Sequence, residues 1–250
     1  MRLRHDARKN SSFAYVDEAG TSQRFFACGV LVHGPLVSGK DDERLNEHIR
    51  MLKVEAGIRL RGDVCWKKTP KPGKYLNLYL RYIEGFFRHP RLSFNAIVVD
   101  THKYPLDSKT FFAGSKDVGI DVFAFHLIEK RIVRFWTGGT RLHIRYDRRS
   151  RPREAYLAKL TSRLRQSEIY SENKPSALII RGRSVTGGRH SLLQVADVLL
   201  GCVVAPLNSA LKHDGKLQLS DSVRSHLGRD PTEPTPPSEK KFNVWRFEAV

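Results

Sequence analysis

Apolar residues alternate with polar ones in some segments of the chain and recur every three or four residues in others. Two early segments, residues 11–20 (SSFAYVDEAG) and 23–34 (QRFFACGVLVHG), are rich in aromatic and β-branched residues and are separated by a Gly/Thr/Ser turn. This pattern predicts an antiparallel hairpin. Helical periodicity then predicts helices over residues 42–56, with Asp41 as the cap, and over residues 75–89, with a basic loop containing Gly and Pro between them.

From residue 92 onward, predicted strands alternate with predicted helices. The strands are residues 92–100, 141–147 and 177–182, and the helices are residues 120–136, 153–165 and 191–204. Such alternation implies right-handed parallel crossovers and a sheet covered by helices. We therefore expect one α/β domain over residues 1–205 with a mixed central sheet and an insertion at about residues 41–89. Residues 206–250 form an extension, in which a Pro-rich linker (228–241) precedes a short terminal strand.

Composition indicates the kind of partner. The 250 residues include 44 Lys+Arg and 26 Asp+Glu, which gives a formal net charge of +18 and a pI of about 10.1. A charge this large favours polyanions, and nucleic acid is the leading candidate. The chain lacks an apolar run of 18 residues and an apolar segment near its start, so we expect no membrane association and no secretion. Three widely separated cysteines indicate a reducing cytoplasm, and no Cys/His pairs have zinc-ligand spacing.

The segment SLLQVADVLLGCVV, residues 191–204, predicts a helix that is apolar on almost every side and yet contains Gln194 and Asp197. These two residues are three apart and share one face with Ser191 and Gly201. A buried carboxylate needs a cationic or protic partner. Either a structural arginine, such as Arg181 or Arg183, pairs with Asp197, or the polar stripe belongs to a functional site.

Three further carboxylates, those of Asp17, Asp100 and Asp147, each end a predicted strand. Functional groups gather at the carboxyl ends of strands in open α/β sheets. Strand alternation places Asp17 and Glu18 on opposite faces, although the following Ala-Gly turn could bring Glu18 back. The simpler interpretations are a turn or cap for each, an Asx turn for Asp100, and an ordinary salt bridge to a nearby arginine for Asp147.

Carboxylates held close together repel one another, and a divalent cation stabilises such a cluster. Mg²⁺ prefers oxygen ligands, and a pair of such ions can promote phosphodiester hydrolysis. Residues 129–165 contain 12 Lys/Arg and three Asp/Glu, so half of the net charge surrounds Asp147. The acidic cluster and the basic surface together predict a nuclease.

Two motifs, YVDEAG (15–20) and LLQVADVLLG (192–201), resemble the paired DE and QxxD motifs of DUF3800, a bacterial domain of unknown function. The resemblance covers residues 13–204 and implies an RNase H-like fold, with acidic ligands from the first strand, the fourth strand and the last helix. Asp17, Asp147 and Asp197 occupy those places. The segment VCWKK (64–68) resembles the family's lysine-containing segment, with Val64 or Cys65 where Glu is usual. Glu18 is the preferred fourth ligand, and Glu129 is the alternative.

Our leading hypothesis is therefore an RNase H-like nuclease that depends on Mg²⁺ or Mn²⁺. Asp17, Glu18, Asp147 and Asp197 would bind metal, and Gln194 would orient Asp197 or a water. Asp100 is a further candidate, and the expected contacts to nucleic acid come from Lys67, Lys68, Arg148, Arg149 and Arg183. The second hypothesis is a non-catalytic nucleic-acid-binding protein with its carboxylates in salt bridges. A third is a nucleotide-handling enzyme that uses the glycines of GRSVTGGRHS, residues 181–190, although this segment lacks the ending of a P-loop.

Overall fold

A single mixed sheet organises the chain. The computed structural model describes residues 11–36, 39–59, 62–134, 141–147, 154–166, 179–185, 190–211 and 213–249. The six strands run in the order β5-β4-β1-β2-β3-β6. Their bounds are β1 (Ser11–Ala19), β2 (Phe25–Leu36), β3 (Leu92–Asp100), β4 (Arg141–Asp147), β5 (Ile179–Val185) and β6 (Phe242–Arg246).

The strand directions follow the predicted pattern. β2 is antiparallel to both β1 and β3, whereas β4 is parallel to β1, β5 is parallel to β4, and β6 is parallel to β3. The predicted mixed sheet, with antiparallel first strands followed by parallel strands, is confirmed. In this order β1 lies at the centre of the sheet, directly beside β4.

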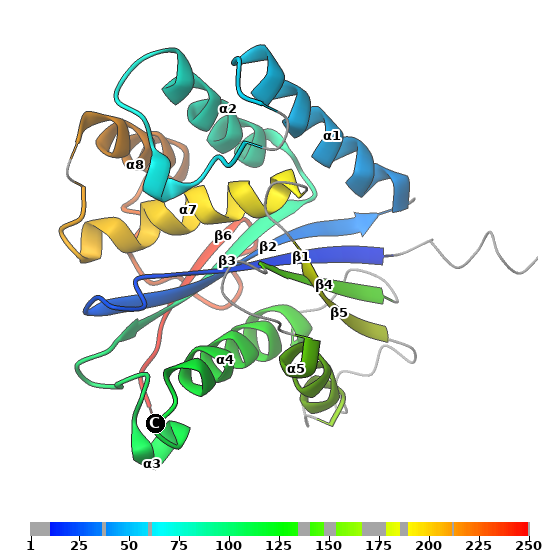
Figure 1. The fold of residues 1–250 in the computed structure, drawn as a ribbon, viewed down its shortest axis with the longest axis vertical. Helices are drawn as coiled ribbons and strands as arrows, with labels where there is room; N and C mark the ends of the chain where they lie inside the picture. Colours follow the sequence, from blue (N-terminus) through cyan, green and yellow to red (C-terminus); the bar gives the residue numbers. More distant parts are fainter. Residues whose placement is uncertain are drawn as a thin grey trace, which may run out of the picture.

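Helices cover both faces of the sheet (Figure 1). One face carries α1 (Gly39–Glu55), α2 (Lys74–Arg88), α7 (Ser191–Leu207) and α8 (Asp214–Leu227), together with the short 3₁₀ helix η2 (Trp66–Lys68). The other face carries α3 (Lys109–Phe112), α4 (Lys116–Leu127), the π-helical turn η3 (Ile128–Val133) and α5 (Glu154–Gln166). Strand alternation divides the core accordingly, with Phe13 and Tyr15 on the α7 face and Ala14 and Val16 on the α4 face.

Helix α7 is buried on nearly every side, as its sequence predicts. All of its residues except Asp197, Pro206 and Leu207 are buried, and it packs across β1 and β2. Because its position between the sheet and the outer helices leaves so little of it exposed, the helix needs apolar residues all round. Asp197 is thus a partly exposed carboxylate in an otherwise buried helix.

Several predicted elements differ from the observed ones. The helix predicted over residues 120–136 begins earlier, at Lys116, and changes to a π-helical turn at Ile128. Helix α8 was not predicted, because its sequence is largely polar with few apolar positions. The terminal strand β6 pairs with β3, and Phe242 and Val244 are fully buried, so residues 242–246 belong to the same core. Within the described part of the chain, no helix is long and apolar enough to cross a membrane.

Candidate functional site

The fold brings together the three elements that carry Asp17, Asp147 and Asp197. Val16 pairs with Tyr146 in the parallel ladder of β1 and β4, so Asp17 and Asp147 follow neighbouring positions at the same end of the sheet. Helix α7, which carries Asp197, packs on β1. The side chain of Asp147 lies outside the described residues. The backbone therefore supports a shared location for these three residues, although they are far apart in sequence.

The carboxylate of Asp197 accepts a hydrogen bond from the backbone N–H of Trp66, at 2.7 Å. Trp66 begins η2, and its indole ring lies directly over Gly201, one turn further along α7, where any larger residue would collide with the ring. The two proposed arginine partners, Arg181 and Arg183, are exposed on the edge strand β5. Asp197 and Gly201 of the polar stripe thus form the surface on which Trp66 docks.

Basic side chains lie close to Trp66, the residue that contacts Asp197. Lys67 and Lys68 follow it in η2 and are exposed, and Lys68 makes only a long contact of 3.9 Å with Asp63. The amine of Lys216 in α8 lies 5.3 Å from the Trp66 ring centre, within the range of a cation–π interaction. The sequence analysis gave Trp66 no role of its own, and it missed Lys216 because α8 was not predicted. The predicted phosphate contacts Lys67 and Lys68 therefore lie beside Asp197.

Tyr79 of α2 holds the segment around Trp66 in place. Its hydroxyl contacts the carbonyl oxygens of Cys65 at 3.3 Å and Lys68 at 3.4 Å. Burial raises the pKa of Tyr79, and the neighbouring Cys65 and Asp197 add to the effect. The hydroxyl consequently remains a hydrogen-bond donor at neutral pH and holds both ends of η2.

Glu18 does not join Asp17 on the α7 face. Its carboxylate accepts a hydrogen bond from the hydroxyl of Tyr146 at 2.8 Å, and the Tyr146 ring is buried in the core on the α4 face. Asp17 accepts the backbone N–H of Glu18 at 2.9 Å. Because β1 stays regular through Ala19, Asp17 and Glu18 lie on opposite faces of the sheet, as strand alternation predicts, and the Ala-Gly turn does not bring Glu18 back.

Asp100 has a structural role. Its carboxylate accepts hydrogen bonds from Arg24 at 3.1 Å and from the His102 N–H at 3.0 Å, which makes the Asx turn given above as the simpler interpretation. Burial raises its pKa, but the hydrogen bonds from Arg24 and His102 outweigh burial, and the pKa is lowered overall. Asp100 therefore needs no bound ion.

The other predicted residues are spread over the molecule. Gln194 is fully buried in α7, between the sheet and α1 and α2. Glu129 is buried in η3 on the α4 face, with the amine of Lys130 at 3.5 Å. Arg148 and Arg149 lie outside the described residues. Arg183 on β5 is exposed and so remains available to a large ligand.

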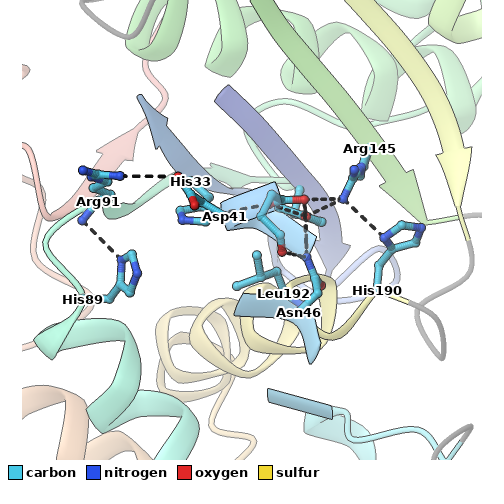
Figure 2. Close-up of polar contacts among 10 residues, drawn as sticks. His33, Asp41, Asn46, His89, Arg91, Arg145, His190 and Leu192 are labelled. Atoms are coloured by element: carbon cyan, nitrogen blue, oxygen red, sulfur yellow. Dashed lines mark hydrogen bonds and ion pairs between the residues drawn. The ribbon is translucent and has the colours of Figure 1, made fainter. Parts of the chain in front are cut away.

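A second polar cluster, which the sequence analysis missed, surrounds Asp42 of α1 (Figure 2). Asp42 is 1% exposed, and it accepts hydrogen bonds from the Tyr15 hydroxyl at 2.8 Å and from Arg145 at 2.8 Å. The Nδ1 atom of buried His33 lies 3.0 Å from the same carboxylate. We call Asp42, Tyr15, His33 and Arg145 the Asp42 cluster. Burial, followed by the charge of Asp42, raises the pKa of Tyr15, so its hydroxyl stays protonated.

The Asp42 cluster ties together the elements of the candidate site. Arg145 also contacts His190, which precedes α7, at 3.4 Å, and Asn46 of α1 accepts the Leu192 N–H at 3.1 Å (Figure 2). Arg145 and Tyr15 stand two residues before Asp147 and Asp17 on their strands. The cluster therefore fixes β1, β4 and the start of α7 relative to one another.

No three His, Cys, Asp or Glu side chains in the described ranges lie close enough to hold a metal ion. Asp17 and Asp197 supply carboxylate oxygens of the kind Mg²⁺ prefers, and a complete ligand set depends on Asp147. The carboxylate cluster remains a prediction.

Fold and site define an α/β protein with a mixed six-stranded sheet and strand-end carboxylates beside a basic segment. Neither a protein-family model nor a curated protein sequence matches the chain. Among solved structures, it is similar to the ribonuclease H2 from Pyrococcus horikoshii OT3, with 13% identity, 87% of this chain and 77% of that chain covered, and a TM-score of 0.43. It is also similar to a chain of the PCNA:RNase HII complex from Archaeoglobus fulgidus, with 12% identity, 95% and 96% coverage, and a TM-score of 0.43.

Proposed function

We propose that this protein is a divalent-metal-dependent nuclease that hydrolyses phosphodiester bonds in DNA or RNA. The observation that carries the proposal is the placement of Asp17 and Asp147 at the same end of adjacent parallel strands, with α7, the helix that carries Asp197, packed across β1. We also propose, on the motifs YVDEAG and LLQVADVLLG, that the chain is a member of DUF3800. The net charge of +18 supports a polyanionic substrate.

In this proposal Asp17, Asp147 and Asp197 would hold Mg²⁺ or Mn²⁺. Ions held there would supply Lewis-acid assistance to phosphodiester hydrolysis. Asp197 is positioned for this role by the Trp66 N–H, which occupies one side of the carboxylate. Gln194, one helical turn before Asp197, would orient it. Glu18 would not bind metal directly. It would help to position Asp147, because it accepts a hydrogen bond from Tyr146, the residue that precedes Asp147.

The segment containing Lys67 and Lys68 would bind the substrate backbone. Both amines are exposed and adjacent to the residue that contacts Asp197. Lysine is a common phosphate ligand because its ammonium group acts as a mobile point charge. A strand held by these lysines would therefore run past the carboxylates.

The test compares Asp197→Asn with Asp100→Asn. Asparagine retains an oxygen that can accept the Trp66 N–H, so Asp197→Asn should melt close to wild type while Mn²⁺-dependent cleavage of labelled DNA or RNA falls at least about 100-fold. Asp100→Asn makes the same chemical change at a carboxylate held by Arg24 and should keep full activity. Cleavage by Asp197→Asn at the wild-type rate would contradict the proposal.

A second candidate is a nucleic-acid-binding protein without catalysis. It is favoured by the Trp66 N–H bond to Asp197, because a backbone donor already stabilises this carboxylate. For such a protein, wild type binds nucleic acid, shows no cleavage with Mn²⁺ or Mg²⁺, and gains no thermal stability from either ion. A gain in melting temperature with Mn²⁺ that Asp197→Asn abolishes would exclude this alternative.

A further inference from the structure

A cavity of about 770 Å³ lies at the other end of the sheet from Asp17 and Asp197. Its walls come from the end of β2, the start of β3, the turn η3 and residues 237–241. Ser12 on β1 lines it, and Asp17 lies five positions further along the same strand, or about 16 Å away. Asn95 and Arg131 place it on the α4 face, whereas Asp17 faces α7. The cavity is thus separate from the candidate active site.

The lining is strongly cationic. Glu239 is the single acidic residue in the described lining of the cavity. Five basic residues line it: Arg91, Arg131, Arg134, Lys240 and Lys241. The Glu239 carboxylate accepts hydrogen bonds from the backbone N–H groups of Lys241 at 2.8 Å and Phe242 at 3.4 Å, and within the described part of the chain it forms no ion pair with a lining cation. Among the described residues, the carboxylate paired with Arg91 is that of Asp41, at a long 3.8 Å (Figure 2). Like charges gathered in one concave space repel, and an anion relieves that repulsion.

Not all five cations serve the same purpose. The amine of Lys241 donates to the carbonyl oxygens of Phe86, His89 and Leu92 at 2.7–2.8 Å, so it holds the end of α2 in place. Arg131 lies with its guanidinium 4.9 Å from the Trp245 ring centre, and its Nε atom is buried without a hydrogen-bond partner among the described residues. An aromatic ring stacked on a guanidinium covers the face of the guanidinium and leaves the N–H groups along the edge of the guanidinium free to bind a planar or tetrahedral anion.

The position of Arg131 is itself unusual. It lies in a π-helical turn, in which the Arg134 N–H bonds to the Glu129 carbonyl at 3.0 Å. Turns of this kind occur often at functional sites, because they redirect side chains away from the regular helical face. The floor beside it is polar as well: Ser12 and Asn95 are 1% and 9% exposed at sheet positions that elsewhere on this face carry Val16 or Ile97.

We propose that this cavity binds the phosphate group of a phosphorylated ligand, through Arg131, Lys240 and Arg91. The volume suits a ligand of nucleotide size. Two sources supply the same chemistry, a free nucleotide or the backbone of a nucleic acid. Phosphate binding itself does not depend on the proposed nuclease function; a nucleic-acid source would extend that function to a second contact, on the far face of the sheet.

The experiment measures binding by calorimetry in metal-free buffer, with inorganic pyrophosphate, ADP and a short single-stranded oligonucleotide as separate probes. Arg131→Gln and Lys240→Glu are the test variants, and Lys159→Glu on the exposed surface of α5 is the charge-matched control. Each test variant should weaken binding about tenfold or more, since a hydrogen bond between charged groups contributes on that scale. Lys240 is exposed, so its substitution leaves the fold intact even if Arg131→Gln unfolds.

The probes identify the source. If pyrophosphate and ADP bind and both test variants weaken them, the ligand is a free phosphorylated molecule. If only the oligonucleotide binds and the same variants weaken it, the ligand is a nucleic-acid strand. Binding of no probe, or equal losses in Lys240→Glu and Lys159→Glu, overturns the phosphate site. Because no metal and no cleavage are involved, this result is independent of the outcome for Asp197→Asn.

Discussion

Arg145 of β4 and Asp42 of α1 form an ion pair of 2.8 Å in which the Asp42 side chain is only 1% exposed. Arg145 stands two residues before Asp147 at the end of β4, and its pair with Asp42 lies between the sheet and α1. The same carboxylate also accepts hydrogen bonds from the Tyr15 hydroxyl and lies 3.0 Å from the Nδ1 atom of His33. A buried pair with this many partners makes the position of α1 and the ends of β1 and β4 depend on one another.

Substituting Asp42 tests this dependence. Asp42→Asn removes the charge and leaves Arg145 largely buried without its counter-ion, so the free energy of unfolding should fall by about 3–5 kcal/mol. Asp41→Asn is the matched control, since the neighbouring Asp41 is 27% exposed and its ion pairs with Arg44 and Arg91 are long, at 3.8 Å, and its effect should be within about 0.5 kcal/mol. Urea denaturation measures both. Equal effects of the two substitutions would show that the Asp42 cluster contributes no more to the free energy of unfolding than the ion pairs of Asp41.

Gly201 provides a test of how Trp66 docks on α7. A methyl group at this position would enter the Trp66 ring, so Gly201→Ala should displace η2 and cost about 1–3 kcal/mol. Gly85→Ala is the control in helix α2, where nothing lies within 4 Å of an added Cβ, and it should stabilise the protein by about 0.5–1 kcal/mol. Denaturant unfolding gives the energies, and tryptophan fluorescence reports the displacement. A neutral Gly201→Ala with unchanged fluorescence would mean that the Trp66 segment adapts freely.

Salt dependence tests the lysines beside Asp197. Each phosphate contact contributes about −0.9 to the slope of log K against log salt for a duplex. The double variant Lys67→Gln, Lys68→Gln should therefore reduce the magnitude of the slope by up to about 1.8. Lys109→Gln with Lys159→Gln removes the same charge from exposed positions on α3 and α5 and should leave the slope unchanged. Filter binding at several salt concentrations decides, and identical slopes for the two double variants would remove Lys67 and Lys68 from the interface.

Stability should fall as the pH is lowered from about 7 to about 5. Burial lowers the pKa of His89, His126 and His143, with further lowering by His33, Lys130 and Arg145, respectively. In the unfolded chain these groups titrate near 6.5, so below this pH the unfolded state binds more protons than the folded state and is favoured.

Thermal melts across this pH range measure the effect, and His143→Gln should make the dependence shallower. The control His48→Gln, at an exposed position on α1, should keep the wild-type slope. A melting temperature that is constant between pH 7 and pH 5 would show that the three half-buried imidazoles accept protons as readily as in the unfolded chain.

Much of the fold follows from local sequence patterns. The strand over residues 92–100 and the strand over residues 141–147 were predicted with their observed bounds, because alternating or continuous apolar runs bounded by turns identify them. The period of two also placed Asp17 and Glu18 on opposite faces, as observed. In α7, the spacing of Gln194 and Asp197 identified a polar stripe on a buried helix.

What local patterns could not supply is the identity of distant partners. Asp41 and Asp42 are the same residue type in the same helical turn, and the sequence analysis assigned a role only to Asp41, as the helix cap. Only the rotation of α1 over the sheet makes Asp42 1% exposed and leaves the Asp41 side chain 27% exposed. Likewise, Asp197 meets Trp66 across 131 residues, and Arg145 meets Asp42 across 103. The period of an element follows from its own backbone geometry, whereas its partner depends on how loops close and which surfaces are buried together, and these are properties of the whole folded chain.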